Sequence, residues 1–80
     1  MEIKEIEEKV KSFLIDELEI DEDKIHGDAR LKADMGIDSL EVVDVVVLVE
    51  KEFGIKMKAE DFKEVKTFDQ FCSFIQNKLG

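Results

Sequence analysis

Ser39 lies in the stretch of the chain whose residue types are best suited to chemistry. Asp38 before it can cap a helix, because its carboxylate can accept hydrogen bonds from the free N–H groups of the first turn. Glu41 completes a pattern like a capping box, and Gly36 can adopt the backbone angles of a tight turn. We therefore place Ser39 at the first helical position, where a phosphate ester would face the positive end of the helix dipole. Taken alone, an ordinary first-turn serine explains the same residues.

The residues after Ser39 predict a helix that runs to Phe53 and is closed by Gly54. At about 100° per residue, the helix has two apolar faces. The wider face, which we expect in the core, consists of Val42, Val45, Val46, Val49 and Phe53. The second is a stripe of Leu40, Val43 and Val47, bordered by Ser39, Asp44, Glu50 and Lys51. A small domain cannot easily bury both faces, and an exposed apolar stripe with a polar rim is typical of a partner site. The alternatives are that both faces are buried or that the valines form a strand.

Length and composition limit the class of protein. The 80 residues fit one domain, residues 1–80, and the hydrophobic content of 44% is enough for a globular fold. The net charge of −9 argues against binding to nucleic acid or to anionic membrane surfaces, and it suits partners with basic patches. The single cysteine excludes an internal disulfide and fits the reducing cytoplasm. We see no signal peptide, and the apolar run 42–49 is too short to span a bilayer.

The rest of the chain predicts an all-α fold, a small four-helix bundle with three longer helices and one short one. We expect a first amphipathic helix from about Glu2 to about Glu17, followed by a long loop over residues 19–33. Ile20, Ile25 and Leu31 are spaced along this loop as apolar anchors. The short helix is expected within 59–64, with Phe62 inward. The last helix is expected to follow a second capping-box pattern at residues 67–70 and to end near residues 77–80.

Other chemistries fit the sequence poorly. Asp21 and Asp23 resemble the start of a calcium loop, but the twelfth position would be Lys32, so we expect no metal site of this kind. His26 is the only histidine, and the residues around Ser39 lack the glycines of a hydrolase elbow, so we expect no catalytic residues. Cys72 lies in the apolar stripe of the last helix, where a small core residue is the simpler interpretation than a reactive thiol.

The segment Asp34-Met35-Gly36-Ile37-Asp38-Ser39-Leu40-Glu41 resembles the phosphopantetheine attachment motif of acyl carrier proteins. The similarity continues in residues 20–25, 52–55 and 65–67, so it covers nearly the whole chain. This chain departs from the family in having Met35 in place of leucine, Lys51 where an acid is common, and no proline near residues 57–58.

The resemblance implies a non-enzymatic carrier. A phosphopantetheinyl transferase would attach 4′-phosphopantetheine from coenzyme A to Ser39, beside the helix cap Asp38, and the arm would hold acyl groups as thioesters. Acyl-handling enzymes of fatty acid or related lipid and polyketide synthesis would then be its partners, and we expect a cytoplasmic monomer. The expected partner surface consists of Leu40, Glu41, Val43, Asp44, Val47 and Glu50. Two alternatives remain open: a helical interaction module without a prosthetic group, and a carrier of amino acids.

Overall fold

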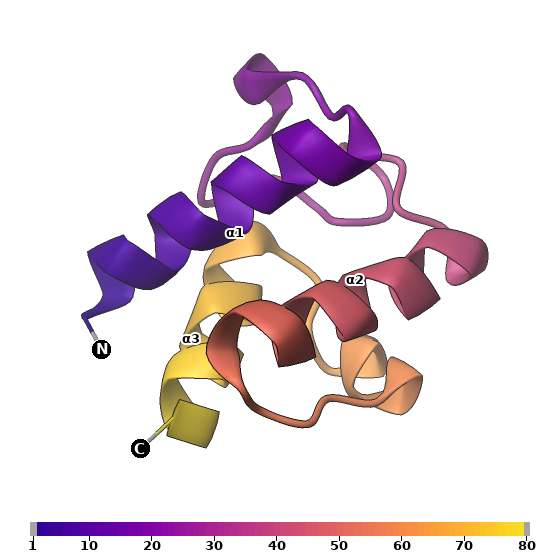
Figure 1. Cartoon of the computed structure of the whole chain (residues 1–80). Coiled ribbons are helices and arrows are strands. Elements are labelled where there is room, and N and C mark those ends of the chain that lie inside the picture. The colour runs from indigo at the N-terminus through magenta and orange to yellow at the C-terminus, as the bar shows by residue number, and fades with distance from the viewer. Residues whose placement is uncertain (1, 80) are drawn as a thin grey trace.

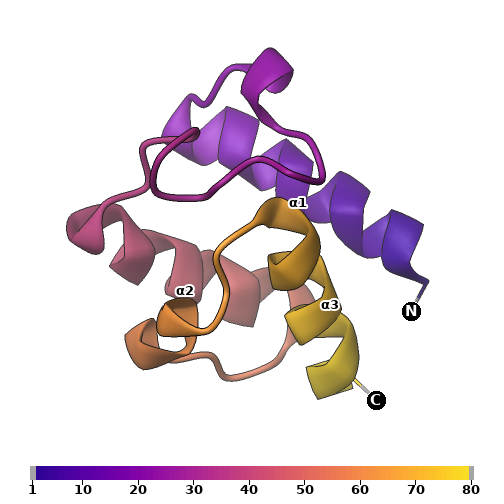
Figure 2. The ribbon, with the colours of Figure 1, turned by 180° about the vertical axis from the view of Figure 1, so that it is seen from behind.

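The computed structural model describes residues 2–79, and these residues form three α-helices, two short 3₁₀ helices and no sheet. The elements in chain order are α1 (Ile3–Leu18), η1 (Glu22–Lys24), α2 (Ser39–Phe53), η2 (Ala59–Lys63) and α3 (Phe68–Leu79). α1 and α2 run in roughly opposite directions, and α3 crosses between them at one side (Figures 1 and 2). The expected all-α fold is confirmed.

The expected fourth helix is a 3₁₀ helix, so the count of four is not confirmed. In η2 the Asp61 N–H donates to the Lys58 carbonyl at 2.9 Å, and the Glu64 N–H donates to the Asp61 carbonyl at 3.2 Å. Both bonds span three residues, which is the 3₁₀ pattern. The segment is five residues long, and so short a run gains too few hydrogen bonds to offset the entropic cost of starting an α-helix.

The ends of the longer helices agree with the sequence prediction to within about a residue. α1 begins at Ile3 and ends at Leu18, each one position later than expected. Its end is set by Glu19, a non-glycine residue in the left-handed conformation with φ of 55°. α2 spans the expected residues and ends at Gly54, whose φ of 70° suits glycine. The expected end of α3 lies partly outside the described residues.

The core lies where the three helices meet and is closed on one side by the long loop between α1 and α2. The expected loop anchors Ile20, Ile25 and Leu31 are buried, as predicted. Three further loop residues, Ala29, Met35 and Ile37, are also buried, although they follow no helical or strand periodicity. The helices contribute the largest fully buried side chains: Ile6, Val10, Leu14, Val45, Val49, Phe71, Cys72 and Ile75.

Backbone hydrogen bonds fasten the long loop to the start of α3. The Leu31 N–H donates to the Lys66 carbonyl at 2.9 Å, and the Phe68 N–H donates to the Ala29 carbonyl at 2.9 Å. These bonds form an isolated antiparallel bridge between Arg30 and Thr67. Two segments far apart in the sequence are thereby held side by side, and they form one end of the cavity described below.

Candidate functional site

Ser39 is the first residue of α2, and it is exposed. The loop before it is fixed by a buried side chain and a hydrogen bond: Ile37 is buried, and its N–H donates to the Leu31 carbonyl at 2.9 Å. Gly36 makes the preceding turn with φ of 73°. Because the backbone is held on both sides, the loop presents the Ser39 hydroxyl at the surface in a defined position.

Asp38 caps α2 as the sequence predicts. Its Oδ1 accepts hydrogen bonds from the backbone N–H groups of Leu40 at 3.0 Å and Glu41 at 3.1 Å. Within residues 2–79 the structure shows no return bond from the Asp38 N–H to the Glu41 carboxylate, so only half of the expected capping box forms. The cap already satisfies two first-turn amides. A phosphate on Ser39 would therefore interact favourably with the positive end of the helix dipole without hydrogen bonds from those N–H groups.

The two apolar faces of α2 differ in exposure as the helical wheel predicts. Val45 and Val49 are completely buried, Phe53 is buried, and Val42 and Val46 are partly buried against the core. On the other face Leu40 is 79% exposed, Val43 57% and Val47 58%. We call these three residues the outer stripe. They are the large hydrophobic side chains that remain exposed in the described part of the chain.

Acidic residues accompany the outer stripe along α2. Asp44 and Glu50 are exposed, and Glu41 is half-buried. Lys51 is also exposed and adds one positive charge at the far end of the helix. The surface that leads away from Ser39 is therefore an apolar strip with a mostly negative border. Such a surface complements a partner with an apolar contact and a basic rim.

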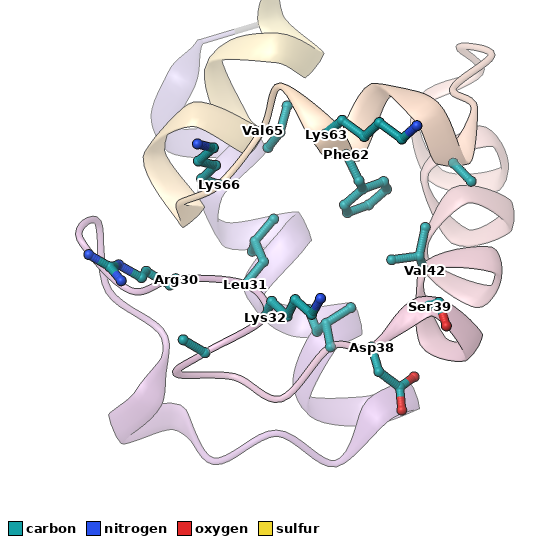
Figure 3. Close-up of a pocket in the computed structure, with 13 residues that line it drawn as sticks. Arg30, Leu31, Lys32, Asp38, Ser39, Val42, Phe62, Lys63, Val65 and Lys66 are labelled. Atoms are coloured by element: carbon teal, nitrogen blue, oxygen red, sulfur yellow. The ribbon is translucent and has the colours of Figure 1, made fainter.

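A cavity of about 540 Å³ opens beside Ser39, between the loop before α2, the first turns of α2, and η2 with the segment after it (Figure 3). Its walls are mainly apolar, and they include Leu31, Ile37, Val42 and Val65. Phe62 also lines it, and the Phe62 ring packs on Phe71 with the ring centroids 5.4 Å apart. The size is within the usual range of ligand pockets, about 300–1,000 Å³.

The structure does not bring His26 to Ser39. His26 is exposed and borders a separate hollow together with Glu7 and Asp69. Among the described residues there is no group of three side chains suited to holding a metal ion.

Cys72 is completely buried, which confirms its expected place in the core. Burial, followed by the charges of Glu7 and Asp69, raises the pKa of the Cys72 thiol from 9.0 to about 12. Because the thiolate is the reactive form, this thiol is inert at neutral pH.

No helix of the described chain is long and apolar enough to cross a membrane.

Sequence reasoning missed the charge of the cavity lining. Four of its residues are cationic, namely Arg30, Lys32, Lys63 and Lys66. No motif marks them, because they come from two segments that only the fold brings together. The sequence offers one signal of this charge. Two basic residues lie within 30–32 and two within 63–66, in a chain whose net charge is −9.

Comparison with known proteins shows which family the chain resembles. The family model described as a phosphopantetheine attachment site matches residues 8–75. The chain is similar to an acyl carrier protein from Thermotoga maritima, 41% identical over 76 residues that cover 95% of this chain and 94% of that protein. It is also similar to acyl carrier proteins from Buchnera aphidicola subsp. Acyrthosiphon pisum, 37% identical over 95% of each chain, and from Solidesulfovibrio magneticus, 33% identical over 94% of this chain and 96% of that protein.

Proposed function

Because the chain belongs to the acyl carrier protein family, whose cofactor is phosphopantetheine, we propose that the Ser39 hydroxyl is the attachment point of the arm. The protein is then a carrier and not a catalyst. When bound, the arm supplies a terminal thiol that holds acyl groups as thioesters. The observation that carries the proposal is the exposed Ser39 at the start of α2, directly after the anchored Ile37 and the Asp38 cap.

The residues around Ser39 fit such an arm. The hydroxyl is exposed, so a transferase can reach it, and it borders a cavity with apolar walls. During attachment Ser39 Oγ forms the new bond to phosphorus and loses its proton, while the nucleotide part of coenzyme A leaves. Asp38 keeps the first turn of α2 intact while a partner engages it, since it satisfies two otherwise free N–H groups.

The partner surface of the carrier is proposed to be the outer stripe together with Glu41, Asp44 and Glu50. Burying Leu40, Val43 and Val47 against an apolar contact supplies binding free energy, and the acidic residues speed the approach of basic enzymes. The transferase and the acyl-handling enzymes would share this surface. Lys51 lies near its end, so a partner with a strongly basic rim there would be disfavoured.

The cargo is proposed to be an acyl chain of fatty acid or polyketide type, not an amino acid. The support is the cavity beside Ser39, whose apolar walls suit a hydrocarbon chain better than a charged ammonium group. We also propose that the protein acts in the cytoplasm as a monomer consisting of one domain, residues 1–80. Its buried free cysteine and net charge of −9 favour these assignments.

The test is the intact mass of the protein after incubation with coenzyme A and a broad-specificity phosphopantetheinyl transferase. Wild type should gain one phosphopantetheine, and Ser39→Ala should gain none. Ser12→Ala and Ser73→Ala are matched controls, because both serines are also exposed on helices, and both variants should be modified like wild type. A well-folded wild type that gains no mass would favour an interaction module without a prosthetic group.

A further inference from the structure

Lys32 lines the cavity beside Ser39, whose walls are otherwise mainly apolar. The protein has 21 acidic residues against 12 lysines and arginines. The lining of the cavity reverses this balance, because it has four cationic residues and a single acid, Asp38. Figure 3 shows the Lys32 side chain extending across the cavity toward Asp38 and the start of α2. Its positive charge is therefore directed toward the edge of the cavity at which Ser39 lies.

The backbone fixes the base of the Lys32 side chain beside the loop that leads into Ser39. The preceding residue, Leu31, is buried, and its carbonyl accepts a hydrogen bond from the Ile37 N–H at 2.9 Å. The Leu31 N–H donates to the Lys66 carbonyl at 2.9 Å, so the backbone before Lys32 is held on both sides. Because Ile37 lies two residues before Ser39, the long flexible stem of Lys32 starts close to the attachment loop.

The Lys32 ammonium has no carboxylate partner among residues 2–79. The ion pair found there joins Lys11 to Glu22 at 3.1 Å, and neither residue lines the cavity. Asp38, the acid of the lining, accepts two backbone N–H groups through Oδ1, and its carboxylate points out of the cavity (Figure 3). An ammonium in a mainly apolar wall without a counter-ion is suited to receive an anion.

The other cations of the lining are directed elsewhere. Figure 3 shows the Arg30 guanidinium directed away from the cavity and the Lys66 side chain on the side away from Ser39. Lys63 belongs to η2, on the opposite side of the cavity from Lys32 (Figure 3). Among the four, Lys32 is therefore the cation placed to meet a group attached to Ser39.

We propose that Lys32 is a positioning residue that pairs with the phosphodiester joining the arm to Ser39. The inference rests on the proposed function, because Ser39 Oγ must carry the arm. The phosphodiester is negatively charged, and lysine binds such a group as a point charge. Two first-turn amides of α2, those of Leu40 and Glu41, are already occupied by Asp38, so a side-chain donor is the available partner. The pairing turns the start of the arm toward the cavity and away from solvent.

The experiment measures how much the arm stabilises the protein with and without the Lys32 charge. Wild type and Lys32→Gln are loaded by the transferase from coenzyme A without an acyl group, so no cargo contributes. Intact mass confirms complete loading, and the thermal midpoint of each apo and holo form is measured at low salt. The rise from apo to holo should be about 3 °C larger in wild type than in Lys32→Gln, and added salt should remove most of this difference.

Two further variants serve as controls. Lys63→Gln removes the same charge from the opposite side of the cavity and should show the same rise as wild type. Lys32→Arg keeps the charge and should retain most of the difference, which a role of the lysine stem in packing alone would not explain. The side chains at positions 32 and 63 are exposed, so all three variants should fold.

Phosphorus NMR of the holo proteins shows which part of the arm Lys32 meets. The phosphodiester resonance should differ between native wild type and native Lys32→Gln, and the two should coincide after unfolding in urea. In native Lys63→Gln the resonance should lie where it does in wild type. This readout is independent of any enzyme that uses the loaded carrier.

Equal rises from apo to holo in wild type and Lys32→Gln would overturn the proposal, as would a difference that Lys32→Arg does not restore. An equal reduction in Lys63→Gln would assign the effect to the overall charge of the cavity, and an unmoved resonance in Lys32→Gln would place Lys32 against a later part of the arm; either result contradicts the pairing. A well-folded wild type without a mass adduct would refute the attachment at Ser39, and this inference with it, so the mass separates the two failures.

Discussion

The carboxylate of Asp38 accepts a hydrogen bond from the Glu41 backbone N–H at 3.1 Å, and this bond closes the first turn of the helix that begins with Ser39. Replacing the carboxylate leaves two amide donors of that turn without a protein partner. We expect Asp38→Ala to lower the free energy of unfolding by about 1 kcal/mol, as measured by urea denaturation. Asp38→Asn should retain most of the stability, because asparagine also caps helices.

Asp44→Ala is the matched control for the cap. Asp44 is an exposed aspartate about 1.7 turns after Asp38, with no capping hydrogen bond in the structure. Its loss should change the free energy of unfolding by less than about 0.5 kcal/mol. Equal losses for Asp38→Ala and Asp44→Ala would show that the cap contributes nothing specific.

The two faces of α2 allow the same substitution to be made in the core and on the surface. Val49→Ala removes two methyl groups from a completely buried site and should cost roughly 1–3 kcal/mol. Val47→Ala lies on the outer stripe and should cost less than about 0.5 kcal/mol. Val47→Glu should likewise keep the thermal midpoint while slowing modification by the transferase. A large drop in its midpoint would instead make Val47 a core residue.

Glu19 ends α1 in a conformation that suits glycine. Its φ of 55° brings Cβ close to the backbone, and its negative charge lies at the negative end of the helix dipole. We expect Glu19→Gly to raise the free energy of unfolding by about 0.5–1 kcal/mol. The control is Glu17→Gly, an exposed position inside the same helix, where glycine should cost about 1 kcal/mol. Destabilisation by both variants would contradict the left-handed cap.

The raised pKa of Cys72 predicts how stability depends on alkaline pH. Well below pH 9.0 the thiol keeps its proton in both the folded and the unfolded state, so its contribution to stability is constant. Between pH 9.0 and about 12 the unfolded chain loses the proton while the folded one retains it, so stability falls as pH rises. The slope from this group approaches about 1.4 kcal/mol per pH unit.

Cys72→Ala isolates the contribution of this thiol. The variant should lose less stability than wild type between pH 8 and pH 10.5, whatever its stability at neutral pH. Parallel pH profiles for the two proteins would contradict the raised pKa. In the native wild type, a thiol reagent at neutral pH should leave Cys72 unmodified.

Helical periodicity explains why much of the site was predictable. The spacing of Val45 and Val49 against Val43 and Val47 follows from about 3.6 residues per turn, so one wheel assigns the buried and the exposed face. The cap at Asp38 is equally local, since its partners lie within three residues. Local patterns of this kind need no knowledge of the tertiary fold.

The features that sequence reasoning missed depend on contacts between distant segments. Met35 and Ile37 are buried because the loop folds back on itself. No periodicity in the sequence predicts their burial. The bridge between Arg30 and Thr67 joins two distant segments, and no local rule predicts it.

A smaller, local departure concerns the second capping box, of which half forms as predicted: the Thr67 hydroxyl accepts from the Gln70 N–H at 3.3 Å. The Gln70 side chain accepts from the Lys66 N–H at 2.9 Å instead of from the Thr67 N–H.

The measurement that tests the central claim most directly is the location of the arm within the modified chain. Trypsin cleaves after Lys32 and Lys51 and releases the peptide 33–51, in which Ser39 is the only residue with a hydroxyl group. Peptide mass spectrometry should find the phosphopantetheine on this peptide alone. An arm found instead on a peptide that carries Ser12, Thr67 or Ser73 would contradict the assignment of Ser39.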